Sequence, residues 1–526
     1  MRLDRLELKS FKNLERFKID FDETQLTTVL IGENGTGKSN LIEAIVQIFR
    51  DLDLNQPTPF AYRLLYRCRN YEISLINEGE SARGRPRVTV SGADITPAEF
   101  QRRKADLLPG IVFGYYSGNG RRLESLFDKH QERYYQEIIS PQRSRRAQPT
   151  KPPLRPFFYC RPAYGSFALL ALLALGDDKI RRFLKRYLGI TGFHSALFVL
   201  RRPYWAQAKP SGVAKDFGDS RFWYARGLVA EFLAELWDRS LAPISHTERV
   251  KDDYREKGSR EGRLYLFVKD QDELARLGQR FGDAKAFFQH LESTDISDLI
   301  REVRVWVTRE GSDHEMPFHE ISDGERQLLT VLGLLTFSRE QEALFLLDEP
   351  DTHLNPAWKL YYLQMLQEWA GENSDSHIII STHDPLTIAG LEQSQVQVMY
   401  RQEGRVCVQP PLMDPRGLGV TGILTQVFGL PTTLDPQTQE LLDHRNRLLR
   451  LEERSLQQET DLRNLSEQLA HLGFMLEARN PDYERYLRAV EEFEKPERLT
   501  YTPEEVERQN KIAQQIIAKL RGQSIQ

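Results

Sequence analysis

The 526-residue sequence has little cysteine, no long hydrophobic run and no excess of either charge. Its three cysteines, Cys68, Cys160 and Cys407, lie far apart and form no CxxC pair, which argues against a zinc site and against a disulfide framework. The longest apolar run, Phe167 to Leu175, is too short to span a bilayer and predicts a buried helix. These absences favour a protein of a reducing cytoplasm with no membrane partner.

The net charge of the chain is −4, from 72 Lys and Arg against 76 Asp and Glu. A net charge this close to zero does not by itself point to a nucleic-acid partner. Any surface that binds DNA must therefore be a local cluster of positive charge. The chain is too long for one compact core, and we expect two or three domains. Its first residues, MRLDRLELKSF, alternate charged and apolar side chains as a strand does, which is not the pattern of a signal peptide.

Apolar strand-like runs separated by helical patterns predict an α/β fold with a mainly parallel core sheet. The sequence also predicts an antiparallel β subdomain. The pattern of residues 1–30 predicts short strands around the turn Lys12–Asn13, and that of residues 71–92 predicts a strand pair. Residues 160–300 read as mixed and mostly helical. Further strands are expected in the runs IVFGYY, REVRVWVTRE, ALFLLDEP and HIIISTHDP.

The segment GENGTGKS, residues 32–39, matches the phosphate-loop pattern G-x-x-x-x-G-K-[ST]. The strand-like TTVLI precedes it and the helical NLIEAIVQIF follows, which is the context that this motif requires. Glycines let the loop amides point at phosphate oxygens, Lys38 would reach the β- and γ-phosphates, and Ser39 would ligate Mg²⁺. The alternative, a chance glycine-rich turn, fits these flanks poorly. The predicted nucleotide-binding residues of the loop are Gly32, Asn34, Gly35, Gly37, Lys38 and Ser39.

Two carboxylates, Asp348 and Glu349, close the apolar run ALFLL. A carboxylate at the end of a core strand can hold Mg²⁺ beside a phosphate loop, which suits Asp348. Its neighbour Glu349 is the candidate general base that polarises the attacking water. His383, in STHDP, ends the next buried strand and is a candidate partner of the γ-phosphate. The alternatives are an acidic strand end at the surface and a structural histidine.

Together these pieces resemble the ATP-binding-cassette ATPases of the SMC and RecF type. In that family two heads pack face to face, and the signature of one subunit closes over the γ-phosphate held by the other. The resemblance therefore implies an ATP-bound head-to-head dimer in which Ser322 and Gly324 act in trans. The matching residues are the signature Ser322, Gly324 and Glu325 in ISDGER, the D-loop Asn355 in LNP, the switch His383, and the basic Lys12 in KSFKNL.

A closer resemblance, to the PtuA-type ATPases of Septu and retron anti-phage systems, covers most of the chain. The segments that carry it are FFYCRPAYGSFALLALLAL, ISDGERQLLTVLGLL, LDEPDTHLNPAWK and GLGVTGILTQVFGLPTTLDPQTQELLDHRN. The last is the most informative because it lies outside the general ATPase motifs. The resemblance implies a homo-oligomeric ATPase with ATP and Mg²⁺ as cofactors, paired with an HNH nuclease subunit similar to PtuB. It also allows a reverse transcriptase with its msDNA product, or other DNA, as partners.

These motifs divide the chain into four parts. We expect residues 1–117 and 301–432 to form the two halves of the ATPase head. Residues 118–300 form an insertion between them, which lacks sustained heptads and which we interpret as a lid or partner-binding domain. Residues 433–526 should be helical, beginning with Asp435 as N-cap and Pro436 at the first position. Leucines there recur every seven residues with a break near Ser455, so the region is either a short coiled coil or helices packed on their own domain.

The chain shows no nuclease motif, neither a Toprim-type acidic pair nor an HNH-like cluster. If the system cuts nucleic acid, another chain does the cutting. The expected function is therefore an ATPase that controls a partner nuclease in phage defence. The first alternative is a RecF-like DNA-repair ATPase without a dedicated nuclease, and the second is a scaffold in which ATP is structural.

Overall fold

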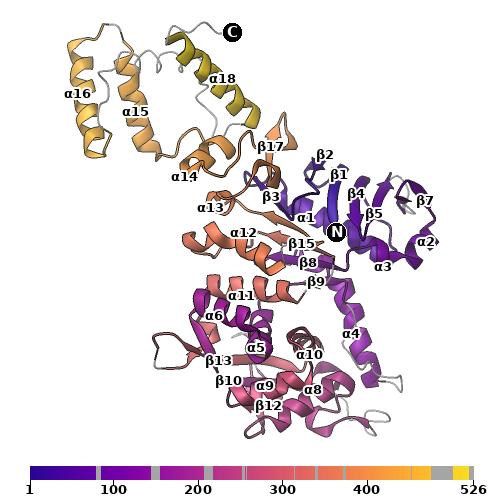
Figure 1. Ribbon diagram of the computed structural model, residues 1–526. Coiled ribbons are helices and arrows are strands. Elements are labelled where there is room, and N and C mark those ends of the chain that lie inside the picture. Colours follow the sequence, from indigo (N-terminus) through magenta and orange to yellow (C-terminus); the bar gives the residue numbers. More distant parts are fainter. Residues whose placement is uncertain are drawn as a thin grey trace. The chain divides into compact units, whose positions relative to one another are not determined.

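The computed structural model describes residues 1–78, 85–143, 155–206, 217–251, 255, 258–312, 314–337, 342–370, 375–451, 453–474 and 502–520 (Figure 1). The chain forms two compact units. Unit 1 comprises Met1–Thr28 and Ser39–Thr382, and unit 2 comprises Val29–Lys38 and His383–Gln526. The chain passes from one unit to the other within strand β3 (Thr27–Gly32), at the start of helix α1 (Lys38–Asp53) and after Thr382.

The core of unit 1 contains a run of parallel strands, as predicted. Their order is β16 (His377–Ser381), β15 (Ala343–Asp348), β8 (Ile111–Tyr116) and β9 (Phe157–Tyr159). Every residue of β15 and β16 is buried, which explains why both read as continuous apolar runs. The register pairs Asp348 with Ser381 and with Tyr116, so the polar ends of three strands meet at one edge.

An antiparallel sheet forms the predicted β subdomain of unit 1. Its order is β2 (Leu14–Asp20), β1 (Arg2–Phe11), β4 (Tyr62–Cys68), β5 (Tyr71–Asn77), β6 (Arg87–Val90) and β7 (Ala93–Ile95). Helix α1 (Lys38–Asp53) packs on this sheet through Phe49, whose ring meets Tyr66 edge-on at 5.3 Å. Two short helices, α2 (Pro97–Arg102) and α3 (Lys104–Leu107), follow.

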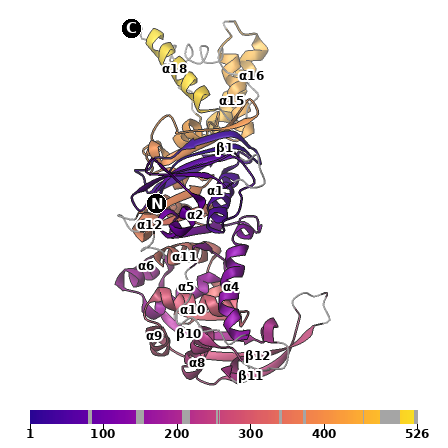
Figure 2. The same ribbon diagram turned by 90° about the vertical axis from the view of Figure 1, so that its right-hand side faces the viewer.

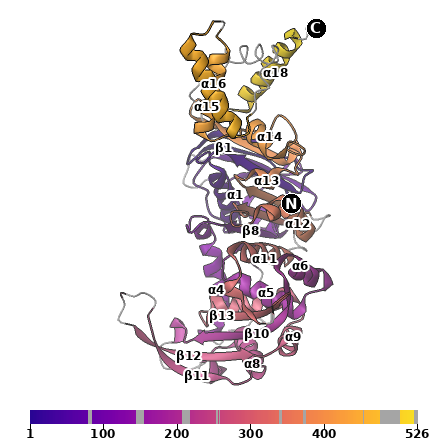
Figure 3. The same cartoon turned by 90° about the vertical axis from the view of Figure 1, so that its left-hand side faces the viewer.

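The insertion of unit 1 contains an antiparallel sheet that the sequence did not indicate. Its order is β11 (Ile244–Val250), β12 (Ser259–Val268), β10 (Ile190–Arg201), β13 (Ile300–Arg309) and β14 (Met316–Pro317). Strand β13, which the sequence placed in the head, pairs with β10 along its length. The described part of the region is still richer in helix than in strand. The hairpin of β11 and β12 projects beyond the helices, and most of β11 is exposed (Figures 2 and 3).

The helices of the insertion pack on this sheet and on one another. They are α4 (Asp128–Arg143), α5 (Tyr164–Leu175), α6 (Asp178–Leu188), α8 (Gly227–Asp238), α9 (Gln271–Arg280) and α10 (Ala284–Ile296). Helix α5 is the predicted apolar helix and is buried almost throughout. It packs against α11 (Asp323–Thr336), which lies between the insertion and the parallel strands (Figure 1). Helix α12 (Pro356–Ala370) packs on α11.

Unit 2 joins a small sheet to the C-terminal helices. Strand β3 (Thr27–Gly32) pairs in parallel with β17 (Val396–Gln402), which pairs antiparallel with β18 (Arg405–Gln409). The helices are α13 (Pro385–Ile388), α14 (Gly419–Gly422), a π-helical turn (Ile423–Val427), α15 (Pro436–Leu449), α16 (Leu456–His471) and α18 (Pro503–Leu520).

The C-terminal helices pack as a hairpin and not as one long coiled coil. Asp435 caps α15 by accepting from the amide of Thr438, as predicted. The heptad break is real, because Ser455 caps a new helix, α16, which packs back on α15. Leu448 and Leu469 are buried in the hairpin, whereas Leu472 is 55% exposed. Among the described helices, none has both the length and the apolar character needed to cross a bilayer.

Candidate nucleotide site

The phosphate loop of unit 2 adopts a backbone that requires glycine. Gly32 has φ 142°, and a Cβ atom there would lie 2.0 Å from the carbonyl oxygen of Met399 on β17. Gly35 and Gly37 have φ angles of 83° and 98°, in the region that side chains disfavour. The glycines of the motif therefore allow the loop to turn tightly and to pack directly on the backbone of a neighbouring strand.

The side chains of the loop are held by its own carbonyl groups. The Lys38 ammonium donates to the carbonyl oxygens of Gly32 at 2.7 Å and Glu33 at 3.2 Å, and the Thr36 hydroxyl donates to Glu33 at 2.8 Å. Asn34 is exposed. Arg401, which no sequence motif marks, donates from its guanidinium to the carbonyl oxygen of Gly35 at 3.0 Å.

Asp348 lies at the carboxyl end of β15 in unit 1 and is only 2% exposed. Its carboxylate accepts hydrogen bonds from the hydroxyl groups of Ser381 and Ser39. Burial raises the pKa of Asp348, and these two hydrogen bonds oppose that rise. The structure thus brings together two of the predicted metal ligands, Ser39 and Asp348, that lie more than three hundred residues apart in the sequence.

Glu349 follows immediately, in a strained backbone conformation. Its φ angle is 52°, which few residues other than glycine adopt and which is typical of functional sites. Its amide donates to the carbonyl oxygen of Ser381 at 3.0 Å, so the left-handed turn is fixed to the neighbouring strand end. The next acid, Asp351, is buried and accepts from the Thr382 hydroxyl at 2.7 Å. Sequence reasoning missed Asp351, although its place in DEPD was a signal.

Lys12 is placed by an ion pair on helix α1. Its ammonium pairs with Glu43, a buried carboxylate that also pairs with the guanidinium of Arg122. Arg122 follows strand β8, and its charge acts against the rise in the pKa of Asp348. The sequence did not identify Arg122, which is half-exposed in its side chain. One buried acid therefore holds two cations, one of which lies near the candidate metal ligands.

The signature residues form the start of helix α11. Ser322 is its N-cap and exchanges hydrogen bonds with Glu325 in a capping box. Glu325 also pairs with Arg309 of β13, which links the signature to the insertion sheet. A Cβ atom on Gly324 would lie 2.4 Å from the carbonyl oxygen of His353. Only glycine therefore lets the signature helix pack this closely on the D-loop.

The last two predicted residues have separate places. Asn355 accepts from the amide of Trp358 at 2.9 Å and so caps helix α12. His383 belongs to unit 2, where it precedes Asp384, the N-cap of α13. Glu349 belongs to unit 1.

Ser39 and Asp348 are suitable ligands for Mg²⁺. A hydroxyl and one carboxylate are a sparse set, and within the described residues no group of three or more His, Cys, Asp or Glu could hold a metal ion. Mg²⁺ keeps several waters and takes phosphate oxygens, so a sparse protein set fits it better than it fits zinc or calcium. When bound there, the ion would neutralise charge on the phosphates.

Two family models of ATPase domains match the chain. One, described as "AAA ATPase domain", matches residues 1–83, and the other, described as "AAA domain, putative AbiEii toxin, Type IV TA system", matches residues 209–389. The Septu protein PtuA of Bacillus mycoides (strain KBAB4) is 31% identical over 133 residues, which are 25% of this chain and 18% of that protein. The chain is therefore similar to part of a PtuA-type ATPase.

The chain is also similar to part of a retron ATPase. The Retron Vc95 probable ATPase of Vibrio cholerae serotype O1 biovar El Tor is 26% identical over 153 residues, 27% of this chain and 28% of that protein. The matched segments span less than a third of each relative. The SMC head domain from Thermotoga maritima (14% identical, 78% of this chain and 99% of that chain, TM-score 0.32) and RecF with ATP (15%, 78% and 97%, TM-score 0.28) also match, at TM-scores too low to show a shared fold.

Proposed function

We propose that this chain is the ATP-binding and ATP-hydrolysing subunit of an anti-phage defence complex in the cytoplasm. The proposal combines the similarity to a Septu PtuA protein and to a retron ATPase with the phosphate-loop motif. The observation that carries it is the hydrogen bond between Ser39, which ends the phosphate loop, and the buried Asp348 at the end of β15. A P-loop ATPase needs these two groups together for Mg²⁺.

Most of the predicted residues have a role in this proposal. The loop amides and Lys38 hold the phosphates of ATP, and Ser39 with Asp348 holds Mg²⁺. Glu349 orients and activates the attacking water, for which its strained position directly after Asp348 is suited. Ser322 and Gly324 complete the site of a second copy of the chain, and His383 contacts the γ-phosphate. Lys12 and Arg122 add positive charge near the phosphates.

The proposed complex contains a second protein that cuts nucleic acid. Two heads dimerise around ATP, and this state controls an HNH nuclease subunit similar to PtuB. The exposed β11–β12 hairpin of the insertion and the helical hairpin of α15 and α16 are the contact surfaces that we propose. A fall in ATP during infection would then release the nuclease.

The test is native mass spectrometry of the chain co-expressed with the product of the adjacent gene, with and without ATP and Mg²⁺. A complex with a small HNH protein, whose stoichiometry changes with ATP in the wild type and not in Lys38→Ala, is the expected result. An ATP-induced dimer that shifts DNA but holds no second protein would contradict the proposal and favour a DNA-repair ATPase. A complex without measurable ATP turnover would favour the scaffold.

A further inference from the structure

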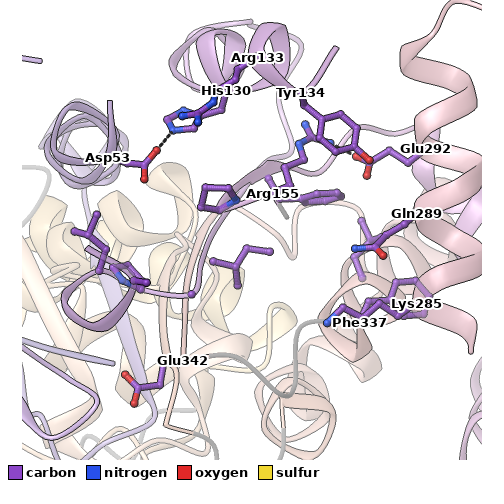
Figure 4. A pocket seen from close by; sticks show the side chains of 18 of the residues that line it. Asp53, His130, Arg133, Tyr134, Arg155, Lys285, Gln289, Glu292, Phe337 and Glu342 are labelled. Carbon is purple, nitrogen blue, oxygen red and sulfur yellow. Dashed lines mark hydrogen bonds and ion pairs between the residues drawn. The ribbon is translucent and has the colours of Figure 1, made fainter. Parts of the chain in front are cut away.

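Two basic side chains in the cavity wall of Figure 4 are paired with acids of unit 1. Arg155 pairs with Glu292 of α10, and both side chains are almost fully buried. His130 hydrogen-bonds to the Asp53 carboxylate at 2.8 Å. Both pairs are structural, because their charges meet inside the fold and neither basic group is left for a ligand.

Arg401 of unit 2 has a different kind of partner. Its guanidinium donates to a backbone carbonyl group, that of Gly35 in the phosphate loop, at 3.0 Å. The side chain is exposed, and within the described part of the chain it takes part in no ion pair. The hydrogen bond to the loop is therefore the contact that distinguishes this arginine from those that are paired with acids.

The pairing of β3 with β17 explains why Arg401 reaches the loop. The two strands run parallel, and the last pair in their register is Gly32 with Met399. Strand β3 ends there, whereas β17 continues to Gln402. The end of β17 therefore runs beside the loop that follows Gly32, and a Cβ atom on Gly35 would lie 3.7 Å from Nη2 of Arg401. The contact thus follows from the register of the sheet.

This contact also orients the amide on the other side of the same peptide group. A peptide unit is planar and trans, so the carbonyl group of Gly35 and the amide of Thr36 point in opposite directions. When Arg401 holds the carbonyl oxygen toward β17, the Thr36 amide must point away from β17. Phosphate loops bind anions through backbone amides that point together into the loop, so the direction of this amide matters for binding.

The structure places the Thr36 amide on the same side of the loop as Lys38. Both groups donate to one acceptor, the carbonyl oxygen of Glu33, at 3.3 Å from the amide nitrogen and 3.2 Å from the ammonium. Lys38 is the residue expected to reach the phosphates of ATP. A phosphate oxygen in that position would therefore meet the Thr36 amide as well.

We propose that Arg401 is a positioning residue, which prepares the phosphate loop for ATP by holding the carbonyl group of Gly35. The Thr36 amide then faces the phosphates beside Lys38 before the nucleotide arrives, so less order has to be created on binding. Arg401 itself does not touch ATP. This role rests on the function proposed for the loop.

A residue of this kind affects binding more than chemistry. The loop holds the phosphates in the ground state and in the transition state alike, so a less ordered loop raises KM and leaves kcat nearly unchanged. The hydrogen bond to the backbone carries the effect, and the exposed charge adds little because salt screens it. The effect should therefore persist at high salt concentration.

The test is ATP binding and steady-state ATP turnover of the full chain with Mg²⁺, at low and at high salt. Arg401→Met keeps most of the side-chain length without a donor, and Arg401→Lys keeps a donor and the charge. Arg405→Met is the matched control, because Arg405 is exposed on β18 opposite Gln402. Hydrogen exchange of residues 32–39 in the ATP-free chain measures the order of the loop without nucleotide.

We expect Arg401→Met to raise Kd and KM for ATP about three- to tenfold at both salt concentrations, with kcat within about twofold of the wild type. Hydrogen exchange of the loop should be faster in this variant. Arg401→Lys should recover most of the affinity, and Arg405→Met should behave as the wild type.

Three results would overturn the role of Arg401. They are an Arg401→Met variant with wild-type affinity and exchange, a loss of affinity that disappears at high salt, and a fall in kcat with unchanged KM. A wild-type chain that binds no ATP would instead refute the function proposed for the loop. In that case the exchange measurement would still decide whether Arg401 orders the loop.

Discussion

Glu349 combines a left-handed backbone with a place directly after the buried Asp348. We predict that Glu349→Gln lowers ATP turnover by about 10²–10⁴-fold, because the amide cannot accept the proton of the attacking water. The substitution preserves side-chain size and removes only the charge, so ATP-dependent assembly should persist. Phosphate release and native mass of the same samples measure both effects. Normal turnover in this variant would rule out Glu349 as the general base.

Gly324 is required by close packing and not by its φ angle. A Cβ atom would lie 2.4 Å from the carbonyl oxygen of His353, so Gly324→Ala must displace the D-loop backbone or the start of α11. We predict a loss of about 1–3 kcal/mol in the free energy of unfolding.

Gly262→Ala is the matched control, since a Cβ atom on Gly262 would meet no atom within 4 Å. That variant should stay within about 0.5 kcal/mol of the wild type in urea denaturation. Equal losses in the two variants would show that the contact with His353 does not matter.

At the residue scale, the sequence predicted the site residues that lie close together in the chain and missed those that lie far from any motif. The phosphate loop could be recognised because its glycines, Lys38 and Ser39 lie within eight consecutive residues. Arg122 and Arg401 could not, because Arg122 follows β8 in unit 1, Arg401 lies on β17 in unit 2, and an isolated arginine carries no pattern. Asp348 was found only because its strand is apolar and its neighbours are unusual. The roles given to Lys12, His383 and the signature residues stay predictions.

At the scale of elements, strand β16 begins with a buried histidine that ties three strands together. Nδ1 of His377 accepts from the amide of Leu3 on β1 at 3.1 Å, and Nε2 lies 3.0 Å from the hydroxyl of Thr28 on β3. Burial lowers the pKa of His377 to about 3, and the nearby positive charges of Arg2 and the N-terminus act in the same direction. The ring is therefore neutral in the folded state at all ordinary pH values.

This pKa predicts a loss of stability in acid. The unfolded chain protonates His377 below its ordinary pKa of about 6.5, whereas the folded chain does not until about 3. The contribution is thus fully present above about pH 6.5 and falls by about 1.4 kcal/mol per pH unit below it. Between pH 7 and pH 5 the wild type should lose about 2 kcal/mol through this residue.

His377→Asn removes the titrating group and keeps an acceptor for the Leu3 amide. The variant should be less stable at pH 7, yet its urea midpoint should shift less between pH 7 and pH 5 than that of the wild type. His246→Asn, at an exposed position of β11, should leave the pH dependence unchanged. An identical pH dependence in wild type and His377→Asn would contradict the explanation. Other buried groups titrate too, so the comparison between variants is what isolates His377.

The elements of the head were predictable because buried parallel strands are continuous apolar runs. The sheet of the insertion was not, because its strands pair at long range and carry mixed patterns. In β10, Ile190–Arg201, buried and exposed positions do not alternate regularly, and the pairing with β13 shifts register in three places. The side chains of β13 alternate clearly between apolar and polar, but this pattern does not indicate which sheet the strand joins.

At the scale of the whole molecule, the trans arrangement of the signature can be tested by mixing two inactive variants. Lys38→Ala lacks the phosphate-loop cation, and Ser322→Arg blocks the signature. In a head-to-head dimer, a mixed pair has one site with an intact loop from one chain and an intact signature from the other. Random pairing should then restore up to roughly a quarter of wild-type ATP turnover.

Each variant alone should remain inactive at the same total protein concentration, and a Lys38→Ala/Ser322→Arg double variant mixed with Lys38→Ala should recover nothing. If the two single variants fail to complement each other while still forming dimers, the signature acts on its own chain's nucleotide or has no catalytic role. The four domains predicted from sequence motifs remain a prediction at this scale, since the two compact units divide the chain on a different basis.

The contact at Gly32 has a consequence for how this gene can vary. The space where a side chain would begin is filled by a main-chain oxygen, that of Met399. Every base change that alters a glycine codon without stopping translation introduces a Cβ atom, so each such change meets the same obstruction. No substitution at position 399 relieves it, because every amino acid carries that oxygen. Compensation by a smaller side chain at the partner residue is thus closed, and direct reversion is the simplest route by which a lineage that loses this glycine regains the loop.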